Sequence, residues 1–154
     1  MWQRKQTVFL AIVVLCMGVS VLFPIWTATT DGVVRSLFPL HYTVQEGDVR
    51  DTVYFPYSLT AILSIAAATV AFMEIRRFDN RLLQIKLGAL NSLLMAGSIA
   101  SAVYFATNLI KENQIAGEYG LAFVFPAIAM ISNIVANRFI RRDEKLVRDS
   151  ERIR

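Results

Sequence analysis

The sequence predicts an all-α membrane protein, folded as an up-and-down bundle of four transmembrane helices. Two observations predict this fold class. Hydrophobic residues make up 55% of the chain and charged residues 18%, whereas soluble proteins average about 45–50% apolar and about 25% charged residues. In addition, the 16 basic and 12 acidic residues all fall outside four uncharged stretches, residues 7–30, 52–73, 87–110 and 119–137.

Each of these stretches is long enough to cross a membrane. About 20 helical residues span a hydrocarbon core of roughly 30 Å, and every stretch has at least 19 residues. The 154 residues then form one membrane domain, with an outer loop at residues 31–51 and a tail at residues 138–154. The first stretch exceeds the apolar core of about 7–15 residues in a signal peptide and lacks a good cleavage site, so we expect a retained helix.

The basic residues are divided unevenly between the segments that flank the spans. The N-terminus, the second connection and the tail together hold 13 lysines and arginines, whereas the outer loop and the third connection hold 3. Cytoplasmic segments of membrane proteins retain lysine and arginine preferentially. This distribution predicts a multi-pass protein whose two termini both lie in the cytoplasm.

Small residues in the third stretch predict how the helices pack. A row of small residues recurs every four positions and consists of Gly88, Ser92, Ala96 and Ala100. Lipid provides no hydrophobic drive for helix association, so close packing needs small side chains. We expect this row to make the third span the central packing helix. Gly97 and Ser101 form a second small pair beside it, and the short connections favour an up-and-down order.

The outer loop and the tail each carry a local pattern. In the loop, residues 40–44 and 49–55 are β-like and flank a Glu46-Gly47-Asp48 turn, a pattern that fits a short hairpin or an irregular loop. In the tail, apolar residues lie seven apart at positions 139, 146 and 153. Because this spacing puts them on one face of a helix, the tail is predicted to be an amphipathic cytoplasmic helix.

The stretches show no arrangement typical of catalysis or of cofactor binding. No ionisable residue falls within them, which argues against a proton relay. The lone His41 and the lone Cys16 leave no histidine cluster or cysteine pair for a metal, a haem or a disulfide reaction, and Ser98 has no base nearby in the spans. We therefore expect no catalytic, cofactor-binding or metal site, and no enzyme activity.

Asparagines and basic clusters are the remaining polar features. Asparagines at positions 91, 108, 133 and 137 either hydrogen-bond between helices or line a polar pocket. The clusters Arg76-Arg77 and Arg138 with Arg141 and Arg142 could meet anionic lipid head groups. Acidic residues interspersed in the tail weaken its positive field, so nucleic-acid binding is not expected.

Several segments resemble a known family. Four segments are similar, in the same order, to an uncharacterised family of small bacterial inner-membrane proteins, domain of unknown function 4293. These segments are MWQRKQTVFL, LFPIWT, NRLLQIKLGALN and NRFIRRDEKLVRDSERIR. The tail pattern of residues 137–144 is the most specific of them. The resemblance implies four spans in a bacterial inner membrane, and it implies no established activity.

Two functions agree with these features. The first is a non-enzymatic accessory or scaffold subunit that docks a membrane or cytoplasmic partner. Its docking residues would be Arg4, Arg81, Arg138, Arg142, Asp143 and Glu144. The positive-inside rule concerns lysine and arginine only, so a docking network would explain the two acids. The alternative is a small-solute transporter or channel built as a homo-oligomer, since four helices leave little room for a pore.

Overall fold

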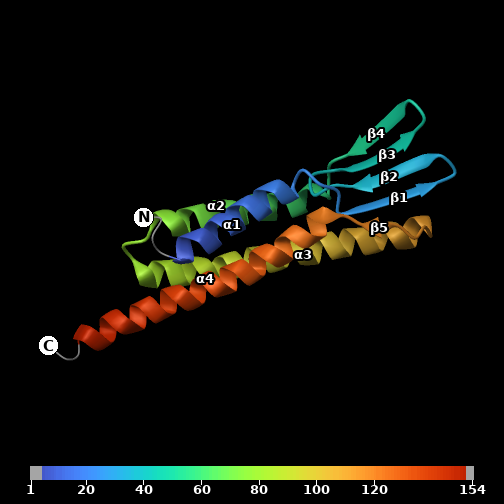
Figure 1. The fold of residues 1–154 in the computed structure, drawn as a ribbon. Helices are drawn as coiled ribbons and strands as arrows, with labels where there is room; N and C mark the ends of the chain where they lie inside the picture. The colour runs from blue at the N-terminus through green and yellow to red at the C-terminus, as the bar shows by residue number, and fades with distance from the viewer. Residues whose placement is uncertain (1–4, 152–154) are drawn as a thin grey trace.

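The computed structural model describes residues 5–151 and shows a long bundle of four helices with a five-stranded antiparallel sheet at one end (Figure 1). The all-α fold class predicted from the sequence is therefore wrong, because the sheet is a substantial second element. We name the end with the sheet the sheet end. The opposite end, where helix α1 begins and helix α4 extends past the other helices, is named the tail end (Figure 1).

The helices of the described chain are α1 (Lys5–Ser20), α2 (Ser58–Arg76), α3 (Arg81–Asn113) and α4 (Leu121–Glu151). Three of them, α2, α3 and α4, are long and apolar enough to cross a membrane. Helix α1 has 16 described residues, a length of about 24 Å. The first predicted span continued to residue 30, whereas α1 ends at Ser20. The second predicted span began at residue 52, six residues before α2 begins.

The strands are β1 (Trp26–Thr30), β2 (Val33–Leu37), β3 (Tyr42–Glu46), β4 (Val49–Val53) and β5 (Glu118–Tyr119), in the sheet order β4-β3-β2-β1-β5. Strands β1 to β4 pair with their sequence neighbours, and β5 adds to β1 from the connection between α3 and α4. The hairpin that was one alternative for the outer loop is present as β3 and β4, but it belongs to this larger sheet.

Local sequence explains why these residues form strands. Thr30 pairs with Val33, so Asp31 and Gly32 form a two-residue hairpin loop, with φ angles of +52° and +78°. Positive φ at both positions is the geometry for which Asp-Gly is preferred. The prediction of a helix to residue 30 relied on the absence of charge, but absence of charge does not distinguish a helix from an uncharged strand.

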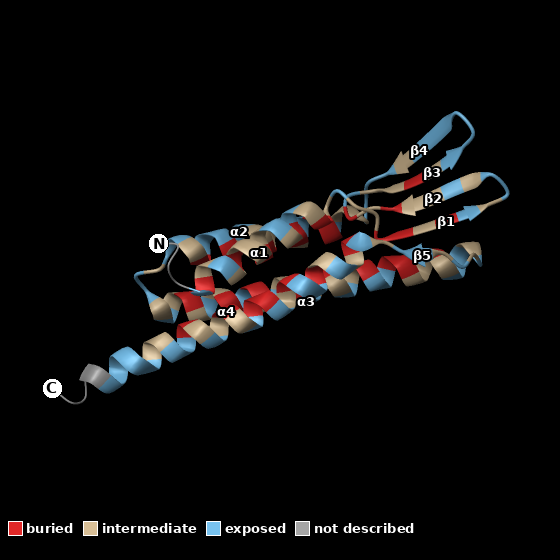
Figure 2. Cartoon of the chain, in the orientation of Figure 1, coloured by how far each residue is buried: buried red, intermediate tan, exposed pale blue. Residues whose placement is uncertain are grey.

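Buried positions on all four helices follow one repeat. On α3 they include Gln84, Gly88, Asn91, Met95, Ser98, Ala102 and Phe105, in steps of four and three. The same steps occur at Gln6, Leu10, Val13, Met17 and Ser20 on α1. A repeat of 3.5 residues is typical of left-handed coiled-coil packing. In Figure 2 the buried segments of the helices face the inside of the bundle, whereas the part of α4 beyond the bundle is exposed or half-buried.

Two apolar clusters stabilise the bundle. The cluster at the sheet end includes Trp26, Leu37, Phe105 and Leu109, and it joins the sheet to α3. The cluster in the middle of the bundle consists of Val13, Met17, Ala67, Ala71, Met95 and Ala129. Because alanines supply half of this second cluster, the helix backbones approach one another closely.

The tail is a direct continuation of α4, which runs without a break to Glu151 (Figure 1). The helical tail predicted from the sequence is therefore present as far as the structure describes it. Of its predicted apolar stripe, Phe139 stacks on Phe9 of α1 with ring centroids 5.8 Å apart, whereas Leu146 is 61% exposed. The third member of the stripe, Ile153, lies outside the described residues.

Candidate polar site inside the helix bundle

The buried seam of the bundle changes from apolar to polar towards the tail end. Glu74 on α2, Asn91 on α3 and Asn133 on α4 are fully buried, and Gln84 on α3 is 1% exposed. Asn137 on α4 belongs to the same region. We name these five residues the polar seam. Each of the first four continues the repeat of buried positions on its helix, so its side chain is placed inside the bundle by packing.

Hydrogen bonds between hydroxyl groups set the register of α2 against α3. Ser64 pairs with Ser98 at 2.8 Å, and Thr60 pairs with Ser101 at 2.9 Å. Since the two helices run antiparallel, this register carries on towards the tail end and brings Glu74 level with Gly88. The side-chain amide of Gln84 donates to the backbone carbonyl of Glu74 at 2.8 Å, which holds the two helices together one turn further on.

Asn133 and Asn137 attach α4 to the same point on α3. The Nδ2 of Asn133 donates to the carbonyl of Gly88 and to the hydroxyl of Ser92, each at 2.9 Å. The amide of Asn137 occupies the space that a side chain at position 88 would need. Gly88 therefore leaves room for the Asn137 amide against α3, and both asparagines of α4 contact α3 near the level of Glu74.

Among the unpartnered buried side-chain atoms of the polar seam, hydrogen-bond acceptors outnumber donors. Its buried side-chain atoms without a hydrogen-bond partner are both carboxylate oxygens of Glu74, the amide oxygens of Gln84, Asn91, Asn133 and Asn137, and one amide nitrogen, Nδ2 of Asn91. The unpartnered buried atoms of the seam are thus six oxygens and one nitrogen. Buried polar atoms normally find a partner, and an unpartnered buried carboxylate is especially costly. This arrangement is suited to a ligand that brings positive charge or protons.

The chemistry of the seam limits that ligand. Carboxylate and amide oxygens are ligands for hard cations. Among the described residues, no group of three or more histidines, cysteines, aspartates or glutamates is placed to hold a metal ion. The seam offers a single carboxylate, and one negative charge is balanced by one positive charge. A proton or a monovalent cation fits this site better than a divalent metal ion.

Sequence analysis did not identify Glu74 as part of a site. It assigned this residue to the second connection, because the uncharged stretch ended at residue 73. The structure extends α2 to Arg76, so a helix long and apolar enough to cross a membrane contains an acidic residue. The available signal was its spacing, since Ala67, Ala71 and Glu74 continue the steps of four and three that begin at Thr60.

The four residues of the predicted packing row differ in burial in the structure. Gly88 is buried and Ser92 is half-buried against α4, whereas Ala96 and Ala100 are exposed. A row with four-residue steps turns by about 40° per step around an α-helix, so it leaves the buried face after two steps. The second small pair lies against α2 instead, where Ser101 bonds to Thr60 and Gly97 lies beside Leu63.

The predicted docking residues also fall into separate groups. Arg81 donates to the backbone carbonyl of Asp143 at 3.4 Å, and Arg81 and Glu144 line one pocket of about 560 Å³ with the start of α3. Arg138 and Arg142 are exposed on α4, and Arg138 lines a groove between α3 and α4. Arg4 lies outside the described residues. The three residues of the first group thus connect the tail to α3.

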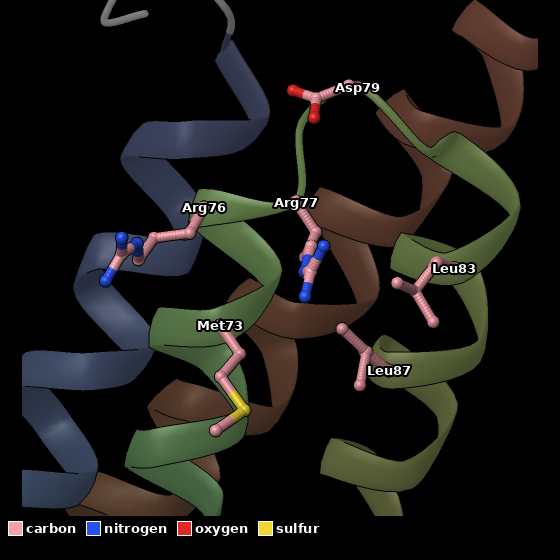
Figure 3. Close-up of a pocket in the computed structure, with 6 residues that line it drawn as sticks. All are labelled: Met73, Arg76, Arg77, Asp79, Leu83 and Leu87. Atoms are coloured by element: carbon pink, nitrogen blue, oxygen red, sulfur yellow. The ribbon is translucent and has the colours of Figure 1, made fainter.

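A pocket of about 680 Å³ lies between α2 and α3 at the tail end, lined by Met73, Arg76, Arg77, Asp79, Leu83 and Leu87. Figure 3 shows Arg77 directed into the space between the helices, whereas Arg76 points towards α1. Asp79 lies above them in the turn that joins the two helices (Figure 3). This pocket combines both signs of charge at the surface and is separate from the buried seam.

His41 has a structural environment in the sheet. Its ring stacks on Phe38 with centroids 5.0 Å apart and is tilted against Tyr54 at 5.6 Å. Burial of the ring, together with the nearby charge of Arg50, lowers the pKa of His41 below its usual value. Ser98, the other isolated candidate for chemistry, is buried and bonded to Ser64.

Comparison with known proteins places the whole chain in one family. The model of the family described as Domain of unknown function (DUF4293) matches residues 2–153. The chain belongs to this family. The resemblance inferred from the terminal motifs is thereby confirmed, and the match covers the four helices and the sheet together. No protein with a curated description matches the chain.

Proposed function

We propose that the protein is a small membrane transport protein that takes up a proton or a monovalent cation at the polar seam. The single observation that carries this proposal is Glu74, a fully buried carboxylate whose two oxygens have no hydrogen-bond partner among the described residues. Ionisable residues inside membrane helices are rare, costly and usually functional. The surplus of amide oxygens around Glu74 supports a cationic ligand, because those oxygens could coordinate it.

The position of the seam suggests the side from which the ligand enters. Glu74 lies within one turn of the C-terminal end of α2, and the tail end carries the excess of lysine and arginine. That excess favours a cytoplasmic location for the tail end, in a bacterial inner membrane. The apolar cluster around Met17 and Met95 lies between the seam and the sheet end. The cation would therefore enter from the cytoplasm and stop at Glu74 until the helices rearrange.

Cation-dependent stability tests the proposal. A ligand that binds only the folded state stabilises it by about 2.7 kcal/mol at 100 times its dissociation constant. The unfolding temperature of the purified protein would be measured in sodium, potassium, lithium or choline chloride at constant ionic strength, over a range of pH. We expect a dependence on pH or on one of the metal cations. Glu74→Gln should remove that dependence, and flux in proteoliposomes should fall in parallel.

The control for this experiment is Asp79→Asn. Asp79 is an exposed carboxylate at the same end of the bundle, so its replacement removes the same charge from the surface. We expect it to leave the cation response unchanged. A Glu74→Gln variant that retains the wild-type response would refute cation binding at the seam.

A second candidate function is an accessory subunit that docks a partner through the tail. The exposure of both Arg138 and Arg142 on α4 favours it. Lysine keeps the positive charge of arginine, so Arg138→Lys with Arg142→Lys should preserve membrane insertion. Lysine does not reproduce arginine's planar group of donors, so the same double variant should lose the partner in pull-down experiments. Retention of a partner at wild-type levels would leave the tail as an anchor for membrane orientation only.

A further inference from the structure

A groove between α3 and α4 at the tail end opens to the outside of the bundle and shares only Asn137 with the polar seam. It has a volume of about 410 Å³ and is lined by Ala89, Ser92, Ile134, Asn137, Arg138 and Arg141. We propose that this groove binds one anionic phospholipid, with its phosphate between Arg138 and Arg141 and an acyl chain along α3. This inference does not depend on cation binding at Glu74.

The charge of the groove is its first distinguishing feature. Its two arginines are exposed, and neither has an ion pair among the described side chains. The neighbouring pockets at the tail end both contain acids, since Asp79 lines one and Asp79 and Glu144 line the other. An anion is therefore attracted to the α3–α4 groove more strongly than to either neighbour. Guanidinium groups also bind phosphate oxygens with matching geometry.

The apolar surface beside the arginines is the second feature. Ala89, Ala96 and Ala100 are exposed along α3, and on α4 Ile131 and Ile134 are 65% and 49% exposed. Small side chains on α3 beside large ones on α4 leave a channel that an acyl chain could follow. The apolar part of α4 ends at Asn137, next to Arg138. The two arginines thus lie at the level where lipid phosphates meet the apolar part of the helix.

A second copy of the protein is a less suitable occupant. In a symmetric dimer with its axis along the membrane normal, the tail ends of both copies lie at the same level. Arg138 and Arg141 of one copy would then approach the same two arginines of the other, and like charges repel. An anionic lipid meets the same surface with complementary charge.

Lipid titration followed by native mass spectrometry tests the proposal. The purified full-length protein, in a neutral detergent, would be titrated with phosphatidylglycerol and with phosphatidylcholine, and we expect one phosphatidylglycerol to bind preferentially. Each basic residue near an anionic lipid surface contributes a factor of about five in affinity. Arg138→Gln with Arg141→Gln should therefore reduce the affinity for phosphatidylglycerol about 25-fold.

The matched control removes two arginines from the same end of the molecule and from other faces. Arg76→Gln with Arg142→Gln should change the affinity for phosphatidylglycerol less than about threefold, because neither residue lines the groove. An equal loss in both double variants would mean diffuse attraction and would refute a defined site. Circular dichroism and the unfolding temperature would establish that both variants are folded.

Two further measurements distinguish the phospholipid from other occupants. Ala96→Phe fills the channel without a change of charge, and it should weaken phosphatidylglycerol binding while glycerol phosphate binding stays as in the wild type. If inorganic phosphate or glycerol phosphate competes as well as the lipid does, the site binds a free anion and the proposal fails. The proposal also fails if the lipid does not bind and the protein forms a discrete dimer that Ala96→Phe disrupts.

Discussion

The interior of the molecule differs in chemistry between its two ends. At the sheet end, Trp26, Leu37 and Phe105 form an apolar cluster that joins the sheet to α3. At the tail end, the buried residues include Glu74, Gln84, Asn91 and Asn133, several of whose oxygens have no partner. The apolar cluster at the sheet end therefore stabilises the fold. The unpartnered polar atoms at the tail end lower the stability of the fold, and binding of a ligand would explain why they are present.

The unpartnered polar atoms at the two ends differ in their arrangement. At the sheet end, the described residues leave single atoms without a partner on Trp26, His41 and Thr43. Trp26 lies on β1, whereas His41 and Thr43 lie just before and at the start of β3, and none of the three is acidic. At the tail end, such atoms lie on three facing helices within about two helical turns, and an acid is among them. Convergence, rather than the presence of buried polar atoms, distinguishes the candidate site.

Substitution of one fully buried residue at each end should give the greatest contrast in unfolding free energy. Trp26→Ala creates a cavity beneath the sheet and should cost about 3–5 kcal/mol of unfolding free energy. Glu74→Leu replaces an unpartnered buried acid with an apolar side chain of similar size, and such replacements are often neutral or stabilising. Reversible unfolding in detergent would measure both. A large loss for Glu74→Leu would show that the acid has a structural role.

Each end also contains a glycine, and replacement of the two glycines by alanine should lower the free energy of unfolding by different amounts. A Cβ atom at Gly120 would collide with the backbone carbonyl of Pro24, which is held by the chain on both sides. The three atoms nearest to a Cβ atom at Gly88 all belong to the side-chain amide of Asn137, which can rotate away. We expect Gly120→Ala to cost about 1–3 kcal/mol by overpacking and Gly88→Ala to cost less. The same unfolding experiment would compare them, and an inverted order would contradict this explanation.

Hydrogen bonds in the middle of the bundle should have a smaller effect. Ser64 and Ser98 are buried and bonded at 2.8 Å. Interhelical hydrogen bonds in membrane proteins average about 0.6 kcal/mol in double-mutant cycles. Ser64→Ala, Ser98→Ala and the double variant should give a coupling energy of about that size. A coupling energy near zero would show that the register of α2 and α3 is set by packing alone.

The smallest effect is expected on the outer face of α3. Ala96 is exposed, and surface substitutions usually change stability by less than about 0.5 kcal/mol. Ala96→Leu should therefore be tolerated, although the row of small residues in the sequence suggested a helix contact. Ala129→Leu is the matched variant, because Ala129 is fully buried in the central cluster and should be overpacked. Similar losses for the two variants would place Ala96 in a helix interface.

Sequence patterns succeeded where one local property decides the structure. Helices α2, α3 and α4 are recognisable by length and lack of charge, and the heptad-spaced tail residues correctly indicated a helix beyond the bundle. The same reasoning failed at residues 21–30, because an uncharged strand next to a helix has the composition of a longer helix. Asp31-Gly32 was the better signal, since the loop needs two residues with positive φ.

The long apolar helices, the segregation of charge and the membership of one family follow from the sequence alone, because each depends on residue type and order along the chain. The polar seam and the division of the packing row follow only from the tertiary structure. Helix register brings Glu74 of α2, Asn91 of α3 and Asn133 of α4 to one level, although α4 is far from α2 in sequence. Register depends on the packing of all the helices together, and no single segment contains that information.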